Sequence, residues 1–244
     1  MNVFAAGLWG GLAALSLLLG AALAMRFTLS NRVIGAVMGF GSGALISSIG
    51  YELVPESLVK GTGRSMALTF ALGTLTFFVA DWAIDARGGE KRKSLAGGAA
   101  GGSGTAIFLG TLLDAIPESL ILGIGLATGG AISLAFLTAV FVSNLPEGIA
   151  GTRSLLDAGN SSRRVVWMWI ALVLVSAVVA GAGYAFAHAV PAADGRYARA
   201  FAAGAVLIML TDVMMPEAFE HGGKMVGLLA TLGFLTAAIL SVME

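Results

Sequence analysis

The fold of this chain is decided by residues 110–151, which read GTLLDAIPESLILGIGLATGGAISLAFLTAVFVSNLPEGIAG. The stretch contains two long apolar runs, and a Pro-Glu pair lies inside each of them: Pro117-Glu118 and Pro146-Glu147. An ionisable side chain in the middle of an apolar membrane segment is costly, and by default it marks a functional site. Two such carboxylates on neighbouring segments, in the same local pattern, predict one shared site.

The composition is that of an integral membrane protein. The chain is 57% hydrophobic and 11% charged, with a mean hydropathy of +0.91, whereas a soluble domain is about 25% charged. Several apolar runs reach the roughly 20 residues that a helix needs to cross a membrane. The runs are continuous rather than alternating, which favours helices over a β-barrel. We therefore expect an all-α, polytopic membrane helix bundle.

The hydropathy pattern predicts one transmembrane domain, residues 1–244, with eight spans. The predicted spans are 2–25, 32–58, 66–84, 105–127, 131–156, 165–189, 197–220 and 222–242. The link 85–104 is charged at first and then rich in Gly, Ala and Ser, which is typical of a flexible linker. Residues 1–25 lack a charged leading region, so they are interpreted as the first span rather than a cleaved signal.

The positions of Lys and Arg predict the orientation in the membrane. With the N-terminus outside, the inside links hold ten of these residues and the outside links hold four. We therefore expect both termini outside, the link 85–104 in the cytoplasm, and a plasma (inner) membrane location. The net charge is zero and there is no basic patch, which argues against nucleic acid as a partner. The absence of cysteine excludes disulfides and thiolate ligands.

Glycines recur every four residues in the second predicted span, at Gly35, Gly39 and Gly43. Small residues at this spacing allow membrane helices to approach closely. We expect another helix to pack along this ridge, although a surface for sliding between helices is an alternative.

Four of the five prolines precede a glutamate. The four motifs are Tyr51-Glu-Leu-Val-Pro-Glu56, Asp114-Ala-Ile-Pro-Glu118, Ser143-Asn-Leu-Pro-Glu147 and Asp212-Val-Met-Met-Pro-Glu217, and they fall on the second, fourth, fifth and seventh spans. Each proline removes one helical hydrogen bond and leaves the carbonyl four residues earlier without its usual donor. The repetition predicts a common use for the four segments.

The motifs of the fourth and fifth spans offer oxygen ligands on one helical face each. Asp114 and Glu118 lie four residues apart, as do Ser143 and Glu147, so each pair points to the same side of its helix. Asn144 lies three residues before Glu147 and adds an amide oxygen. Carboxylate, amide and carbonyl oxygens suit hard or borderline divalent cations. The sequence therefore predicts a metal site made by these five residues.

The sequence resembles the ZIP (Zrt/Irt-like) family of divalent metal transporters. That family has eight spans, both termini outside, a long cytoplasmic loop after the third span, and a His-Asn-x-Pro-Glu-Gly signature or a near variant on the fourth and fifth spans. Here Glu118 and Glu147 match the metal-binding glutamates of the family, and Asn144 matches the asparagine of the fifth-span motif. Asp114 and Ser143 stand at the two histidine positions, so this chain departs from the family there.

The resemblance implies transport of divalent ions through a site halfway across the membrane, with no prosthetic group. Without imidazole the ligands are oxygen-rich, which favours manganese and harder ions over zinc. Zn²⁺, Fe²⁺, Mn²⁺ and Cd²⁺ all stay open as substrates. The resemblance also implies a 3+2+3 arrangement, in which the first three spans are related to the last three by an inverted repeat.

The remaining acidic residues of the second and seventh spans are expected to form an ion path. Glu52 and Glu56 would lie at its outer end, and Asp212, Glu217, Glu220 and His221 at its inner end.

Other functions stay open at the level of sequence. The same carboxylates could carry protons in a transporter of a small solute, and a relative that binds metal without transporting it is a further alternative. An enzyme is disfavoured, because nothing in the sequence pairs Asp114 with Asp212 and the chain has only two histidines. The expected surroundings are the lipid bilayer, and a homodimer is one alternative for the oligomeric state.

Overall fold

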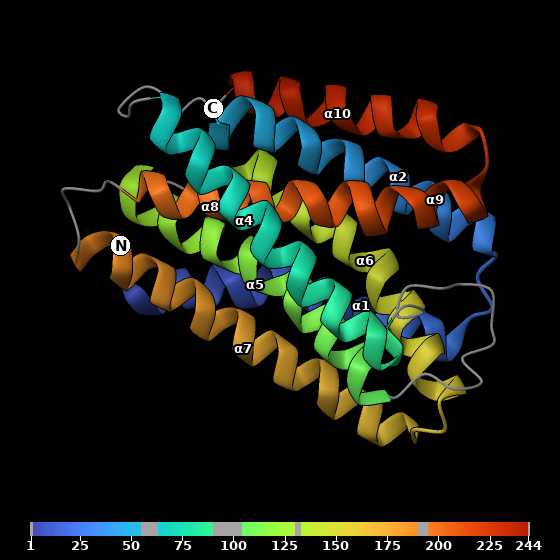
Figure 1. The fold of residues 1–244 in the computed structure, drawn as a ribbon. Coiled ribbons are helices and arrows are strands. Elements are labelled where there is room, and N and C mark those ends of the chain that lie inside the picture. The colour runs from blue at the N-terminus through green and yellow to red at the C-terminus, as the bar shows by residue number, and fades with distance from the viewer. Residues whose placement is uncertain (1, 55–62, 90–103, 130–132, 190–194, 244) are drawn as a thin grey trace.

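The protein is a bundle of membrane-length helices (Figure 1). The computed structural model describes residues 2–54, 63–89, 104–129, 133–189 and 195–243. In these ranges no strand is present, and eight helical segments are long and apolar enough to cross a membrane. The predicted all-α, polytopic bundle is confirmed, and the protein is an integral membrane protein.

The described spans follow one another in chain order. The elements are α1 (Val3–Arg26), α2 (Asn31–Ser48) with the π-helical turn η1 (Ile49–Leu53), α4 (Gly63–Ile84) with η2 (Asp85–Gly89), α5 (Gly104–Gly129), α6 (Leu134–Asp157), α7 (Ser162–Ala189), α8 (Arg196–Met209) with η4 (Leu210–Met214) and α9 (Met215–Gly222), and α10 (Met225–Met243). The end of the second predicted span and most of the link 85–104 lie outside the described residues.

Side-chain caps fix where several helices begin. The side-chain oxygens of Asn2, Ser30 and Ser133 accept hydrogen bonds from the backbone N–H three residues later, at 2.9, 3.4 and 3.0 Å respectively. Each cap satisfies an N–H group that has no partner within its own helix. Between α9 and α10 the chain turns sharply at Gly223, whose φ of +64° favours glycine.

The glycine ridge of α2 is a packing surface, as expected. Gly35 lies against Ala218 and Gly222 of α9. A Cβ atom added at Gly43 would overlap the carbonyl oxygen of Ala230 on α10. In return, a Cβ atom added at Gly233 of α10 would overlap the carbonyl oxygen of Phe40 on α2. We call such a mutual approach a reciprocal glycine contact; it brings Cα hydrogens onto carbonyl oxygens across the helix interface.

Three more helix pairs are joined by reciprocal glycine contacts. They are α4 with α8 (Gly73 on Phe201, Gly204 on Phe70), α1 with α6 (Gly20 on Leu145, Gly148 on Leu17) and α5 with α7 (Gly123 on Ala180, Gly183 on Leu120). α1 also packs along α7, and α9 along α2. Together with the continuity of α8 and α9 through η4, these contacts define a first bundle, α1, α5, α6 and α7, and a second bundle, α2, α4, α8, α9 and α10. α2 on α6 and α5 on α8 make the main contacts between them.

The pairing pattern follows the 3+2+3 inverted repeat. Exchanging α1 with α7, α2 with α8, α4 with α10 and α5 with α6 reproduces the same helix contacts. The equivalence extends to backbone detail, because a π-helical turn begins six residues after Gly43 in α2 and six residues after Gly204 in α8. Exchanged spans run in opposite directions, because their positions in the order of spans differ by five, or by one for α5 and α6. Both chain ends lie toward the same end of the bundle (Figure 1).

The backbone irregularities occur at other motifs than the sequence suggests. α5 and α6 run as continuous α-helices through Pro117 and Pro146, although each proline removes one helical hydrogen bond. Instead, a π-helical turn precedes the Pro-Glu pair in each of the second and seventh spans. Val54 N–H donates to the Ile49 carbonyl at the end of η1, and Met215 N–H donates to the Leu210 carbonyl at the end of η4. A widened turn needs room; the η1 and η4 turns have exposed residues, whereas α5 and α6 are enclosed at their motifs.

The reciprocal glycine contacts make a stability prediction. Gly43→Ala should lower the unfolding temperature, because overpacking against a backbone carbonyl costs about 1–3 kcal/mol. The matched control is Gly125→Ala in α5, where no atom lies within 4 Å of the added Cβ. That change should be neutral or stabilising, because alanine favours helix over glycine. Thermal unfolding in detergent, followed by tryptophan fluorescence, measures both; equal shifts would contradict the packing assignment.

Candidate metal-binding site

The contact between Thr111 of α5 and Gly151 of α6 shows which face of α5 lies against α6. A Cβ atom added at Gly151 of α6 would lie 3.9 Å from the hydroxyl oxygen of Thr111 on α5. Asp114 and Glu118 follow Thr111 by three and seven residues. Residues at these spacings share one helical face, so both carboxylates lie on the side of α5 that faces α6.

The same contact sets the face that α6 turns toward α5. Glu147 and Asn144 precede Gly151 by four and seven residues, and so they share its face. α5 and α6 are consecutive, antiparallel spans. Going forward along α5 from Thr111 and backward along α6 from Gly151 therefore leads in the same direction across the membrane. Measured along the helix axes from the Thr111–Gly151 contact, Asp114 and Glu147 lie at about 5–6 Å, and Glu118 and Asn144 lie at about 10 Å. The candidate ligands form two layers between the helices.

All five predicted ligands are shielded from the surroundings. The exposed fractions are 1% for Asp114, 2% for Glu118, 0% for Ser143, 4% for Asn144 and 2% for Glu147. These residues lie well inside the spans Ile107–Thr128 and Leu134–Asp157. The placement matches what the sequence predicts, while the binding of metal by these residues stays a prediction.

Ser143 lies where the two bundles meet. A Cβ atom added at Gly41 of α2 would come within 2.7 Å of the Ser143 Cα, so only glycine allows α2 to approach this closely. The Ser143 hydroxyl donates to the Val140 carbonyl at 3.0 Å. Its oxygen keeps lone pairs that can accept a bond or ligate an ion.

A buried hydrogen bond holds α6 against α7 behind the site. Trp169 donates from its indole N–H to the Thr152 hydroxyl at 2.8 Å, and both side chains are fully buried. The Trp169 ring also covers Gly151, the residue whose contact with Thr111 sets the faces of α5 and α6. Trp169 thus fixes the C-terminal half of α6.

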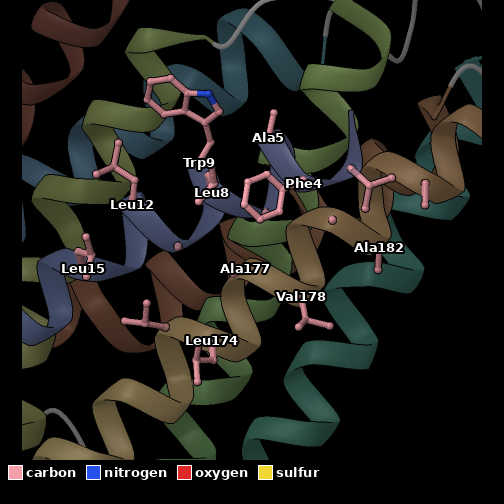
Figure 2. A pocket seen from close by; sticks show the side chains of 16 residues that line it. Phe4, Ala5, Leu8, Trp9, Leu12, Leu15, Leu174, Ala177, Val178 and Ala182 are labelled. Atoms are coloured by element: carbon pink, nitrogen blue, oxygen red, sulfur yellow. The ribbon is translucent and has the colours of Figure 1, made fainter. Parts of the chain in front are cut away.

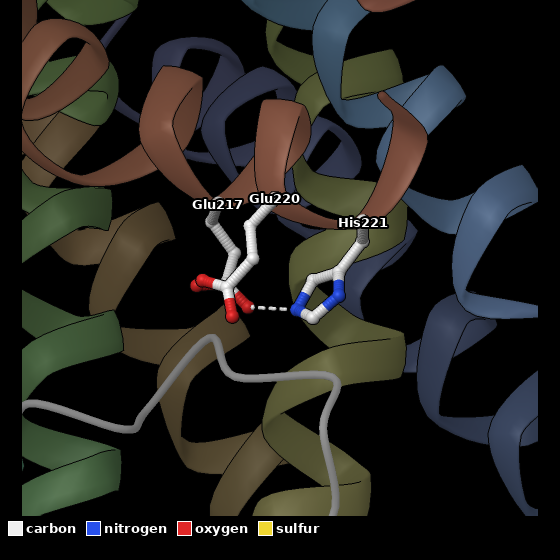
Figure 3. A group of neighbouring side chains, drawn as sticks. All are labelled: Glu217, Glu220 and His221. Carbon is white, nitrogen blue, oxygen red and sulfur yellow. Dashed lines mark hydrogen bonds and ion pairs between the residues drawn. The ribbon is translucent and has the colours of Figure 1, made fainter.

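The second acidic group is at the end of α9. Ligand atoms of Glu217, Glu220 and His221 lie within 4.8 Å of one another (Figure 3). His221 Nε2 is 2.8 Å from Glu217 Oε1. In the described part of the chain, Asp114, Glu118 and Glu147 do not form a group this close.

The two expected ends of the ion path lie at opposite ends of the bundle. The contact of Gly35 with Gly222 places the end of α9 beside the start of α2. Glu52 lies at the other end of that span, in η1, and accepts a hydrogen bond from Ser241 of α10 at 3.2 Å. Asp212 is exposed in η4. Glu56 lies outside the described residues.

Two buried charged residues were missed by the sequence reasoning. Asp81 is 3% exposed and Arg199 is 6% exposed, and both lie near the ends of predicted spans. Asp81 continues a stripe with Gly73 and Phe77, the neighbouring buried residues of α4, and this four-residue spacing is a signal that could have identified it. Arg199 similarly precedes the buried Ala203 by one turn.

A large groove on the bundle surface does not involve the carboxylates. It has a volume of about 1040 Å³ and runs between α1 and α7 (Figure 2). Phe4, Leu8 and Leu12 line one side, Leu174 and Val178 line the other, and every lining residue is apolar. This composition suits contact with lipid chains rather than a polar substrate.

Comparison with known proteins found no protein-family model and no curated protein that matches this chain. The chemistry of the site therefore follows from its own residues. Three carboxylates, one amide and one hydroxyl supply oxygen atoms for a divalent cation. A dication bound to three ionised carboxylates would give the site a formal charge of −1. A proton on one of the carboxylates would bring that charge to zero.

The support behind the site makes a second prediction. Trp169→Phe should destabilise the protein by roughly 1–3 kcal/mol, because it leaves the buried Thr152 hydroxyl without its donor. Trp167→Phe is the matched control, since Trp167 is 60% exposed, and it should change little. Unfolding temperatures in detergent, read from circular dichroism, measure both; a Trp169 effect no larger than the Trp167 effect contradicts the prediction.

Proposed function

We propose that this protein transports divalent metal cations across the membrane. The observation that carries the proposal is the set of three carboxylates, Asp114, Glu118 and Glu147, that are at most 2% exposed within membrane spans. No Lys, Arg or His occurs in residues 104–152, so α5 and α6 carry no basic side chain of their own between these limits. The nearest element with a buried basic residue is α8, which packs on α5 and carries Arg199. One arginine offsets one negative charge at most, and a divalent cation is a suitable counter-charge for the others.

The packing supports alternating access around this site. Each bundle is held internally by reciprocal glycine contacts, and Gly41 and Ser143 meet at the seam between the bundles. Transporters built from inverted repeats expose a central site to each side by rocking or sliding one bundle against the other. In this protein the first bundle carries the ligands, and the second bundle carries the acidic groups near both ends.

The ion path is proposed to run from Glu52 and Glu56 at the outer end to Glu217, Glu220 and His221 at the inner end. The close approach of the last three ligands supports a weak site for ion release. The orientation proposed from the Lys and Arg distribution places these three on the cytoplasmic side of the plasma membrane, and both termini outside.

The ligand chemistry supports Mn²⁺, Fe²⁺, Zn²⁺ and Cd²⁺ as candidate ions, with oxygen ligands favouring the harder members. The resemblance of the fourth- and fifth-span motifs to those of the ZIP family supports the same class of substrate.

Transport is tested by ion uptake into proteoliposomes, with each of the four ions offered in turn. Glu118→Gln/Glu147→Gln keeps the side-chain shapes but removes two charges, and we expect it to reduce uptake to the level of empty liposomes. Asp157→Asn, an exposed change at the end of α6, is the control and should retain uptake. Equal uptake by the double variant would contradict the site. Uptake of a small solute that is driven by a pH gradient and needs no metal ion would instead favour a proton-coupled solute transporter.

Selectivity is tested by restoring imidazole. Asp114→His/Ser143→His should shift competition between Zn²⁺ and Mn²⁺ toward Zn²⁺ by about tenfold or more, because imidazole suits zinc better than manganese. The readout is uptake of one labelled ion in the presence of the other. Asp157→His, which adds imidazole outside the site, serves as the control, and an unchanged ratio in the double variant would place the ligands elsewhere.

A further inference from the structure

Arg153, near the inner end of α6, donates two hydrogen bonds out of its own bundle. Its Nη2 lies 2.6 Å from the Leu29 carbonyl oxygen, and its Nη1 lies 3.1 Å from Asn31 Oδ1. Arg153 follows Glu147 by six residues, or about 9 Å along the helix. It thus acts on the helix that carries three of the five candidate ligands.

The two acceptors belong to the connection between the bundles. Asn31 is the first residue of α2 in the second bundle, and Leu29 lies in the link from α1 to α2. The flanking residues Phe27 and Ser30 are extended rather than helical. The Ser30 carbonyl accepts the first hydrogen bonds of α2, whereas Leu29 precedes the helix and its carbonyl accepts from Arg153. The rigid guanidinium group can therefore bind a backbone and a side-chain acceptor together.

An apolar contact closes the same seam next to Arg153. Ile34 of α2 packs with Ile149 and Ala150 of α6, and Leu29 packs beside them. Apolar contacts of this kind tolerate small shifts in register, because they have no preferred direction. The hydrogen bonds of Arg153 are directional, and they are satisfied only near the observed register of α6 on α2.

We propose that Arg153 is a latch that selects between two registers of the bundles: its bonds to Asn31 and Leu29 hold the arrangement seen here, and they must break when the first bundle moves. The role of this latch in transport rests on the proposed function, whereas its effect on the register of the bundles does not. Arg153 is a positioning residue, because it acts through α6 rather than by touching an ion.

The chemistry of the latch predicts changes of opposite sign at its two ends. Arg153→Gln removes the charged donor and should favour the released register. Asn31→Asp replaces the acceptor with a carboxylate, and the resulting charge-assisted bond should favour the latched register. In the Arg153→Gln background, Asn31→Asp should lose its effect, because the two changes act on one contact.

The test measures the separation of the bundles directly. The chain has no cysteine, so Ser162→Cys at the start of α7 and Met225→Cys at the start of α10 give one spin label on each bundle. Both sites are exposed and lie at the same end of the bundle as Arg153. Double electron–electron resonance in liposomes, without added metal, then gives the populations of the label separations.

We expect the ratio of the population matching this structure to the alternative to fall about tenfold with Arg153→Gln and to rise with Asn31→Asp, because bonds to charged groups are the stronger ones. Arg163→Gln removes the same charge from an exposed site at the same end, and it should leave the ratio unchanged. Arg153→Lys, which keeps the charge but not the planar group, should lie between wild type and Arg153→Gln.

Identical distributions for wild type, Arg153→Gln and Asn31→Asp overturn the latch. An Asn31→Asp effect that persists in the Arg153→Gln background also overturns it, because Asn31 would then act through another group. The result is independent of ion transport: the distance shifts can occur in a protein that carries no metal, and metal uptake can occur without them.

Discussion

The cost of placing carboxylates inside a membrane is the constraint on which this structure depends. Asp114, Glu118 and Glu147 lie in apolar spans, and each is at most 2% exposed. Such groups persist only where polar partners or a bound cation offset the loss of water. The helices α1, α2, α7 and α8 pack directly on α5 or α6 and enclose the polar site, while α4 and α10 pack mainly on α8 and α2.

Glycine makes that enclosure close. Lipid tails are as apolar as leucine, so membrane helices gain little by burying apolar surface against each other, and close backbone approach supplies the attraction instead. The reciprocal contacts, such as Gly43 on Ala230 and its equivalent Gly204 on Phe70, occur within the two bundles. Between the bundles lie the Gly41–Ser143 crossing and the hydrogen bonds of Arg153. Rigidity inside the bundles and specific contacts between them are the properties that alternating access needs.

The sequence was sufficient for the spans, the glycine ridge of α2 and the burial of the five ligands, because hydropathy and helical spacing are local signals. It was insufficient for Asp81 and Arg199, since nothing local to a span end tells how deeply a neighbouring helix covers it. The π-helical turns were missed for a similar reason. A proline signals a disturbed turn, but whether the turn widens depends on the room around it, which exists at η1 and η4 and not at Pro117 or Pro146.

The central claim is that α5 and α6 hold a divalent cation between them, and Mn²⁺ binding measures this most directly. In purified protein, the decrease of the free Mn²⁺ electron paramagnetic resonance signal counts bound ions. The account predicts a saturable site of higher affinity that is lost in Glu118→Gln/Glu147→Gln, which leaves only the weak binding of the group at the end of α9. Glu217→Gln alters only that group and should retain the site of higher affinity. High-affinity binding that survives the loss of Glu118 and Glu147, or that disappears with Glu217 alone, would contradict a site between α5 and α6.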